Sequence, residues 1–264
     1  MPTCRAGIRA LWGDNPEWFQ WLTRSLIVPT CRFLAPGYGY GVDRVPRDGG
    51  IVVAANHFSG IDPPLIGSYC RRTIYYMTKI ELLDVPVVGE LLRWTGAFAV
   101  RRGESDRDAI RLARWLVANG HAVGLFMEGT RQRLGHPGPA HPGAVMIAVQ
   151  EGVPIVPCGI DSFRWSPTNR RACAVVWGEP ITLDVPKTGR GYKAGAAFLE
   201  RELVRLWRLA AQAVGDGFPQ ELPDGARRHG AVWPWQQERR TELPPWPDEE
   251  WAAGPRGLTS PRAS

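Results

Sequence analysis

The stretch that decides the fold is Ile51-Val52-Val53-Ala54-Ala55-Asn56-His57. In it a run of apolar residues is followed by two polar side chains that can take part in chemistry. Five apolar residues without polar alternation are typical of a strand that is buried on both faces. Runs of the same kind recur at 74–77, 98–100, 122–126, 155–160 and 172–177. A series of such strands predicts the centre of a layered sheet.

Helical patterns stand between these runs. Pro63-Pro64 opens one that reaches about Cys70, and the Ser-x-x-acid pattern at Ser105 starts another that stops at Asn119-Gly120. Further helices are expected between Lys79 and Gly96, over 144–151, and over about 192–214. Strands that alternate with helices predict an α/β fold, with a layered, largely parallel sheet flanked by helices.

Length and composition fit one such domain with appendages. The chain has 264 residues, of which 44% are hydrophobic and 22% charged, and its mean hydropathy is −0.22. These values exclude a wholly disordered chain and a polytopic membrane protein. The formal charge of +6 suits anionic partners such as phospholipid surfaces, phosphorylated cofactors or nucleic acid, without choosing among them.

Cysteine usage and the lack of a long apolar run indicate a cytoplasmic setting. Five cysteines, with no Cys-x-x-Cys pair, argue against a disulfide framework and a structural zinc site. No uncharged run approaches the ~20 residues that span a bilayer, and the first residues lack the pattern of a signal peptide. We therefore expect reduced, buried thiols and no transmembrane helix.

The first 44 residues predict a helical segment at a membrane interface. Asn15 is a suitable N-cap, and Pro16 suits the first helical position. An apolar face follows, formed by Trp18, Phe19, Leu22 and Leu26 and widened by Trp21 and Val28. Such a face suits the bilayer interface, where indole rings prefer to lie. Periodicity alone equally allows a helix packed on the protein's own core.

The remainder divides into a domain over 45–215 and a tail over 216–264. From Gly215 onward the chain holds eight prolines and four of its twelve tryptophans, without periodicity. This composition predicts an extended or disordered tail. Its tryptophans suit either docking on the domain or contact with lipid.

His57 and Asp62 are the first candidates for chemistry. His57 follows a buried strand, and Asp62 stands five residues later, beyond a turn that contains Gly60. A carboxylate on one ring nitrogen fixes the imidazole tautomer and raises the basicity of the other nitrogen, so that the ring can take a proton from an alcohol. The alternative is a turn in which Asp62 caps the following helix.

Three further blocks follow other strands. One block ends in two arginines and reads Gly96-Ala97-Phe98-Ala99-Val100-Arg101-Arg102. Another ends in an acid, a glycine, a hydroxyl and an arginine and reads Phe126-Met127-Glu128-Gly129-Thr130-Arg131. Val153-Pro154-Ile155-Val156-Pro157 begins a third strand. Because ligands gather at the carboxyl ends of parallel strands, His57, Arg102 and 128–131 are expected to line one crevice. Arg suits bidentate phosphate contacts.

These four blocks, in this order, resemble the lysophospholipid acyltransferase family, whose best known members are 1-acyl-glycerol-3-phosphate acyltransferases. The likeness covers roughly residues 45–185 and implies that family's glycerol-phosphate acyltransferase-like fold. Three features depart from the family pattern: Arg101 replaces a common Asp, Gln132 a usual Ser, and Ala140-His141-Pro142-Gly143 a frequent Phe-Lys-x-Gly. The last two bear on the acceptor more than on the chemistry.

The resemblance implies transfer of a fatty acyl group from acyl-CoA, or from acyl carrier protein, to the hydroxyl of a lysophospholipid. His57 would be the general base and Asp62 its support. Arg102 and Arg131 would bind the acceptor phosphate, with Glu128, Gly129 and Thr130 shaping the pocket. The family blocks add as further site residues Asn56, Ser59, Lys79, Gly96 and Pro157.

No metal or redox cofactor is implied, and the expected partners are the membrane phospholipid surface, the lysolipid acceptor and the acyl thioester. The resemblance also favours the N-terminal helix as an interfacial anchor, with the protein peripheral on the cytoplasmic face of the membrane. Alternatives are another lysolipid or glycolipid alcohol as acceptor, a thioester hydrolase that uses His57 and Asp62, or a lipid- or nucleic-acid-binding module. Nucleic acid is disfavoured because no binding motif interleaves cations with aromatic residues.

Overall fold

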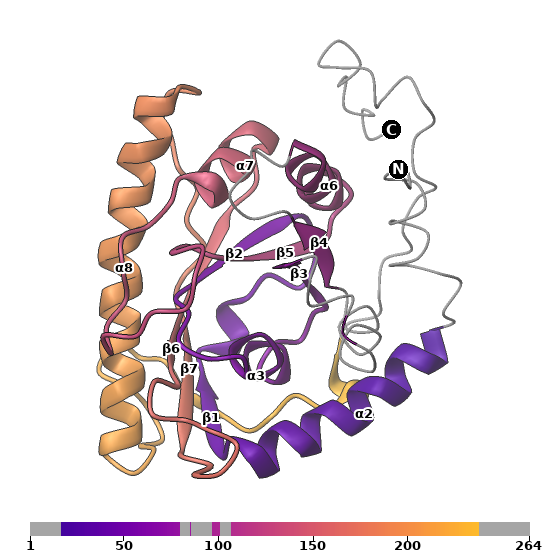
Figure 1. Ribbon diagram of the computed structural model, residues 1–264, viewed down its shortest axis with the longest axis vertical. Coiled ribbons are helices and arrows are strands. Elements are labelled where there is room, and N and C mark those ends of the chain that lie inside the picture. The colour runs from indigo at the N-terminus through magenta and orange to yellow at the C-terminus, as the bar shows by residue number, and fades with distance from the viewer. Residues whose placement is uncertain (1–16, 80–84, 86–96, 101–106, 238–264) are drawn as a thin grey trace.

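The computed structural model describes residues 17–79, 85, 97–100 and 107–237 (Figure 1). Within these residues eight strands form one sheet in the order β4-β3-β5-β2-β6-β7-β1-β8. Their bounds are β1 Gly37–Tyr40, β2 Ile51–Ala55, β3 Ile74–Lys79, β4 Phe98–Val100, β5 Ala122–Phe126, β6 Ile155–Asp161, β7 Cys173–Trp177 and β8 Arg228–His229. The runs quoted from the sequence thus supply the sheet.

Strand directions confirm the largely parallel sheet. From β4 to β6 every neighbouring pair is parallel, and so are β1 and β7. Only β6 with β7 and β1 with β8 are antiparallel among the described strands. The parallel block matters for the site, because it brings the carboxyl ends of β2, β5 and β6 to one edge.

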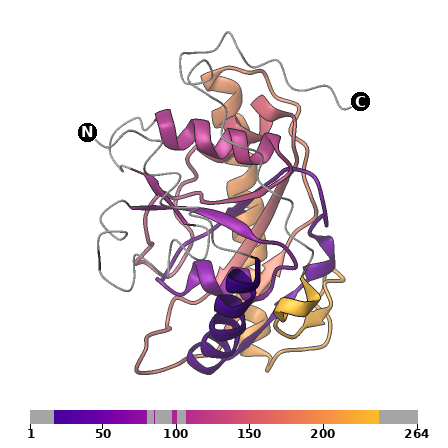
Figure 2. The same ribbon diagram turned by 90° about the vertical axis from the view of Figure 1, so that its right-hand side faces the viewer.

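Helices cover both faces of the sheet. Their bounds are α2 Glu17–Leu34, α3 Asp62–Ser68, α6 Arg107–Ala118, α7 Gly143–Glu151 and α8 Gly189–Gly215, with short 3-10 turns η1 Val42–Arg44 and η2 Pro234–Gln236. Figure 2 shows α6 on one side of the sheet and α2 with α3 on the other. Alternate β2 residues serve the two cores: Val53 and Ala55 face the α2–α3 side, and Val52 and Ala54 face the α6–α7 side.

α2 is apolar on two opposite sides. Val28 and Cys31 are buried in the core, whereas Leu22, Leu26 and Phe33 are 42%, 63% and 67% exposed. The three exposed residues follow the spacing i, i+4, i+11, which puts them on one face of a helix. Val28 therefore belongs to the core side and not to the predicted interfacial face. We refer to Leu22, Leu26 and Phe33 as the α2 stripe.

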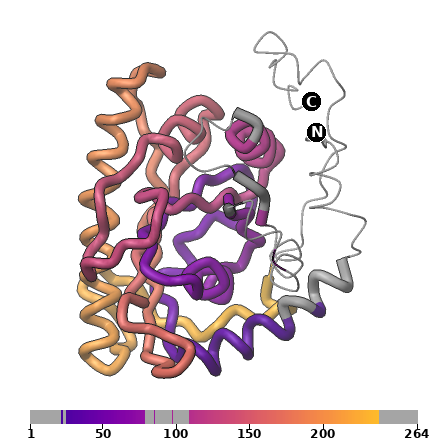
Figure 3. The backbone as a smooth tube through the Cα atoms, viewed as in Figure 1, coloured from indigo at the N-terminus to yellow at the C-terminus, as the bar shows by residue number. Residues whose placement is uncertain are grey.

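The first part of the expected tail, residues 216–237, packs on the domain instead of extending away from it. Its strand β8 pairs with β1, and Ala231 and Val232 are buried in the core. Figure 3 shows the chain returning along the side of α2 after α8. We call residues 216–237 the C-terminal strap.

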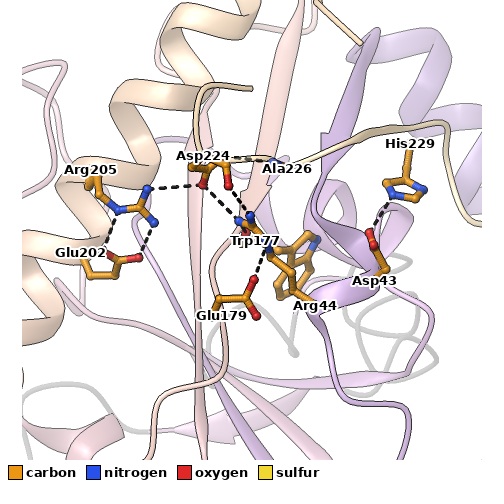
Figure 4. A network of polar contacts seen from close by, with 9 residues as sticks. All are labelled: Asp43, Arg44, Trp177, Glu179, Glu202, Arg205, Asp224, Ala226 and His229. Atoms are coloured by element: carbon orange, nitrogen blue, oxygen red, sulfur yellow. Dashed lines mark hydrogen bonds and ion pairs between the residues drawn. The ribbon is translucent and has the colours of Figure 1, made fainter. Parts of the chain in front are cut away.

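Ion pairs hold the strap in place (Figure 4). The Asp224 carboxylate accepts hydrogen bonds from Arg44 (3.1 Å) and Arg205 (3.3 Å), and His229 Nε2 lies 2.9 Å from Asp43 Oδ1. These partners are far apart in sequence, and β8 has only two residues. The sequence therefore contains no periodic pattern that predicts the packing of the strap on the domain.

Some expectations fall outside the described residues: Asn15, Pro16, Gly96, Arg101, Arg102 and Ser105, the helix before Gly96, and the chain after 237. In the described part of the chain no helix is both long and apolar enough to cross a membrane. The four cysteines of that part, Cys31, Cys70, Cys158 and Cys173, are free thiols and buried.

Candidate functional site

His57 is the second residue after β2, next to Asn56, close to the rigid end of the strand. Its Nδ1 lies 2.8 Å from Asp62 Oδ2, and both side chains are buried. Asp62 begins α3, but its side chain turns back toward residues 57–59, and the residue that caps α3 is Ile61. The structure therefore brings the imidazole and the carboxylate together, and the helix-capping alternative for Asp62 does not hold.

The Asp62 carboxylate accepts hydrogen bonds at both oxygens. Oδ2 receives the backbone N–H groups of Phe58 (2.7 Å) and Ser59 (2.9 Å) besides the imidazole. Oδ1 receives the hydroxyls of Ser59 (3.0 Å) and Ser162. Carboxylate oxygens accept hydrogen bonds and do not donate them. His57 Nδ1 therefore carries the proton toward Asp62, which leaves Nε2 as the basic ring nitrogen.

Two neighbours hold the imidazole and its strand. The Phe126 ring, at the end of β5, stacks on His57 with 3.9 Å between ring centroids and an interplanar angle of 18°. The Asn56 amide bridges to β6, since it donates to the Ile160 carbonyl at 2.9 Å and accepts from the Ile160 N–H at 2.8 Å. The predicted residue Asn56 thus fixes the strand end from which His57 projects.

The Glu-Gly-Thr-Arg turn follows β5, the strand beside β2. The Gln132 N–H donates to the His57 carbonyl at 2.8 Å, which ties the turn to the candidate base. Gly129 has φ 66°, in the left-handed region that favours glycine. Thr130 and Arg131 are exposed beside this tie. The turn therefore presents a hydroxyl and a guanidinium group to solvent at the edge that holds His57.

Glu128 is the buried acid of this turn. Burial raises its pKa to about 7, although hydrogen bonds to its carboxylate partly offset the rise. Oε1 accepts from the Gly138 N–H at 3.4 Å, and Oε2 has no hydrogen-bond partner among the described residues. Near neutral pH this side chain is thus divided between its acid and carboxylate forms.

The other predicted residues lie elsewhere or outside the described chain. Lys79 ends β3 and pairs with Val100 of β4. Pro157 lies inside β6 opposite Ala54, and its ring is packed against Gly178. Arg102 and Gly96 are outside the described residues. Pro157 has a place in the sheet, and the phosphate-binding role of Arg102 remains a prediction.

Ser162 is a site residue that the sequence reading missed. It follows β6, is buried, and donates its hydroxyl to Asp62 from 100 residues away. The only local signal is that a small polar residue follows a buried strand whose carboxyl end lies beside that of β2. A serine in that place is too common to be selected without the fold.

The arrangement equips the site for proton abstraction from a substrate hydroxyl by Nε2 of His57. Within the described residues there is no group of three or more His, Cys, Asp or Glu side chains that could hold a metal ion. The class of protein that fold and site define is thus an α/β domain with a carboxylate-supported histidine at the carboxyl edge of a largely parallel sheet.

Comparison with known proteins agrees with this class. Residues 39–161 match the family model Acyltransferase. A 1-acyl-sn-glycerol-3-phosphate acyltransferase of Bacillus subtilis is 33% identical over 119 residues, which cover 45% of this chain and 59% of the relative. A lyso-ornithine lipid O-acyltransferase of Rhodobacter capsulatus is 30% identical over 125 residues, which cover 46% of this chain and 43% of the relative. The matches span less than two-thirds of these relatives.

A solved structure shares the fold. The crystal structure of the 1-acyl-sn-glycerophosphate acyltransferase PlsC from Thermotoga maritima superposes with a TM-score of 0.61 at 21% identity, over 78% of this chain and 87% of that one. Residues 39–161 thus match the Acyltransferase family model, and the relatives of this region include 1-acyl-sn-glycerol-3-phosphate acyltransferases. The family resemblance of the sequence blocks is confirmed.

Proposed function

We propose that the protein is an O-acyltransferase of phospholipid biosynthesis. It moves a fatty acyl group from acyl-CoA, or from acyl carrier protein, to the hydroxyl of a lysophospholipid. The observation that carries this proposal is the contact of His57 Nδ1 with Asp62 Oδ2 at 2.8 Å, which leaves Nε2 as the base. The match of residues 39–161 to the Acyltransferase family model supports the same reaction.

In the proposed reaction His57 acts as base and then as acid. Nε2 takes the proton of the acceptor hydroxyl while the oxygen attacks the thioester carbonyl carbon, which gives a tetrahedral intermediate. Collapse of that intermediate forms the ester, breaks the carbon–sulfur bond and releases the thiolate, which receives the proton from Nε2. Asp62 stabilises the imidazolium formed in between. No acyl-enzyme and no redox step is required.

The preferred acceptor is 1-acyl-glycerol-3-phosphate, and the product is then phosphatidic acid. The exposed guanidinium of Arg131, close to the tie between Gln132 and His57, supports binding of an acceptor phosphate. Arg102 is proposed for the same phosphate. The relative from Rhodobacter capsulatus is named for a different acceptor, a lyso-ornithine lipid. Testing the proposal therefore requires that transfer rates to different acceptors be compared directly.

The proposed site of action is the cytoplasmic face of the membrane. The α2 stripe leaves apolar side chains exposed on the side of the helix that faces away from the core. Such a face lies in the interface of a bilayer, with the helix axis along the surface. A peripheral enzyme seated this way reaches a lysolipid without extracting it into water.

Product analysis tests the proposal. Purified full-length protein is incubated with labelled acyl-CoA, or labelled acyl carrier protein, and a panel of lysolipids, and the products are read by mass spectrometry. We expect an acylated product that requires an acceptor, most abundant with 1-acyl-glycerol-3-phosphate. Free fatty acid formed at the same rate without any acceptor would identify a thioester hydrolase instead. Vesicle binding without transfer from either donor would identify a binding module.

A further inference from the structure

The loop between β6 and β7, residues 162–172, joins the candidate active site to the exposed side of α2. At its start Ser162 donates to Asp62. Further along, Trp165 Nε1 donates to the Leu34 carbonyl at 2.8 Å, at the end of α2. Near its other end the Arg170 guanidinium lies over the Phe33 ring, 4.6 Å from the centroid. One short loop therefore touches both the catalytic carboxylate and the α2 stripe.

The surface of this loop is cationic and partly apolar. It carries Arg164, Arg170 and Arg171, which are all exposed, and it contains no acidic residue. Phe163 is 40% exposed among them. A guanidinium group binds phosphate oxygens bidentately, and an aromatic side chain beside it suits the interfacial layer of a bilayer.

A second loop extends this surface toward the candidate active site. The backbone of Gly135 lies against the Phe163 ring, since a Cβ at Gly135 would come within 2.9 Å of it. The same loop exposes Leu134 (79%) together with Arg131 and Arg133. Phe163 in turn meets Phe58, the neighbour of His57, edge to face at 5.7 Å. The cationic and apolar surface thus continues from α2 to the rim of the site.

Hydrogen bonds give the 162–172 loop a defined shape. Asn169 Oδ1 accepts from the backbone N–H groups of Ser166 (2.7 Å) and Arg171 (3.2 Å), and its Nδ2 donates to the Arg164 carbonyl at 2.6 Å. Arg170 has φ 42°, which is unfavourable for a residue with a side chain. A turn that is fixed in this way presents its three arginines together.

We propose that the 162–172 loop is a second membrane-contacting element, which binds the headgroups of anionic phospholipids while the α2 stripe enters the apolar layer. This inference rests on the proposed function, since it sets the candidate active site against the lipid surface that holds the acceptor. A bilayer is favoured over an acidic soluble protein because the arginines adjoin exposed apolar side chains and continue into the α2 stripe.

The test compares charge-matched triple variants in vesicle sedimentation. The loop variant is R164Q/R170Q/R171Q. The control, K187Q/R190Q/K193Q, removes three exposed cations at the start of α8, which packs near α7 at the opposite end of the molecule from α2 (Figure 1). L22S/L26S reports on α2. Vesicles are phosphatidylcholine with or without phosphatidylglycerol, at low and high salt.

We expect the loop variant to bind anionic vesicles at least about tenfold more weakly than wild type, because each basic residue near an anionic surface contributes about fivefold. The loss should shrink at high salt and vanish on pure phosphatidylcholine, where L22S/L26S should still show a loss. The control should bind like wild type. Loop-variant binding equal to wild type on anionic vesicles would overturn the inference.

A soluble assay separates this inference from the proposed function. Acyl transfer to a short-chain, water-soluble lysolipid should be unchanged in the loop variant, whereas transfer to an acceptor embedded in anionic vesicles should fall. If wild type transfers no acyl group, the proposed function fails while the vesicle result still decides the inference. If the loop variant keeps its vesicle binding but loses affinity for acyl carrier protein, the loop is a donor-protein site and the inference is wrong.

Discussion

Asp62 is a fully buried carboxylate whose two oxygens both accept hydrogen bonds, from the nearby residues Phe58 and Ser59 and from Ser162 in the loop after β6. This arrangement leaves it one orientation, with Oδ2 toward the imidazole. The spacing of His57 and Asp62 allowed the pair, because a turn of this length lets the carboxylate fold back, but it also allowed Asp62 to cap the helix. The order of the four sequence blocks, and not the spacing, favoured the pair. Ser162 was not predictable, because its contribution depends on β6 lying beside β2.

Removing the Ser162 hydroxyl should loosen the carboxylate and slow the reaction. In Ser162→Ala we expect kcat for acyl transfer to fall roughly tenfold, since a hydrogen bond to a charged group contributes about 1.5–3 kcal/mol. KM for the acceptor should stay the same, because the Ser162 hydroxyl contacts Asp62 and is not proposed to contact the acceptor. Steady-state kinetics on one lysolipid measures both constants.

Ser68→Ala is the matched control for this variant. Ser68 is also buried, but its hydroxyl donates to the Pro64 carbonyl within α3. We expect it to lower the melting temperature without changing kcat. Equal kcat for Ser162→Ala and wild type would refute the positioning role.

Glu128 should make the stability of the protein depend on pH. Its folded pKa of about 7 lies above the ordinary value of 4.5, so the folded state holds this proton more tightly than the unfolded state. The stabilisation is full below pH 4.5 and is lost as the pH rises toward 7. Each pKa unit between the folded and the unfolded state corresponds to about 1.4 kcal/mol, so the loss of unfolding free energy reaches about 3 kcal/mol.

Glu128→Gln removes that dependence. We expect its unfolding free energy, relative to wild type, to be higher at pH 8 than at pH 5, as measured by urea denaturation at both values. Glu221→Gln, at an exposed position, serves as the control. A relative stability that does not change with pH would contradict the account of a buried, proton-binding Glu128.

At the scale of elements, the contact of α8 with β6 depends on one glycine. A Cβ at Gly159 would lie 2.4 Å from both the Leu206 carbonyl carbon and the Trp207 nitrogen, which are backbone atoms of α8. Backbone cannot yield as a side chain can, so the helix would have to move away from the sheet. The close approach therefore requires glycine at this position.

Gly159→Ala should destabilise the protein by about 3 kcal/mol, because forced overpacking displaces a whole helix. Thermal unfolding followed by circular dichroism measures this effect. Gly215→Ala is a suitable control, since nothing lies within 4 Å of its added Cβ. Alanine also has a higher helix propensity than glycine, so this change should not destabilise α8. Similar melting temperatures for the two variants would show that α8 packs less closely than described.

Strands were easier to predict than the orientation of the first helix. Unbroken apolar runs such as Ile51–Ala55 match their strands because both faces of a parallel strand are covered. In α2 both sides are apolar, so periodicity could not show whether Val28 or Leu26 faces the core. That choice depends on the surface of α3 and the sheet, which the local sequence does not contain.

At the scale of the whole molecule, the C-terminal strap closes the fold on the β1 side. Burial favours a raised pKa for Asp224, but the Arg44 guanidinium and the Ala226 N–H outweigh it and hold that pKa below its ordinary value. The carboxylate thus joins the strap to η1 and, through Arg205, to α8. The composition of residues 216–264 predicted an extended or disordered tail. The pairing of Arg44 with Asp224 could not be predicted, because the two residues are 180 positions apart and leave no local pattern in the sequence.

Asp224→Asn should release the strap. We expect a loss of about 2 kcal/mol in unfolding free energy, because a part-buried charged partner of Arg44 is removed, and faster trypsin cleavage after Arg227 and Arg228. Asp216→Asn, which changes an exposed acid at the end of α8, controls for charge. Cleavage at the wild-type rate would mean that β8 pairing alone holds the strap.

The most direct measurement of the central claim is the rate of acyl transfer from labelled thioester to a lysolipid acceptor by wild type, His57→Ala and Asp62→Asn. We predict that His57→Ala loses at least about a hundredfold in rate, as expected on removal of a general base, and that Asp62→Asn also loses activity, while both keep the far-UV circular dichroism of wild type. Retained transfer by a folded His57→Ala protein would contradict the account.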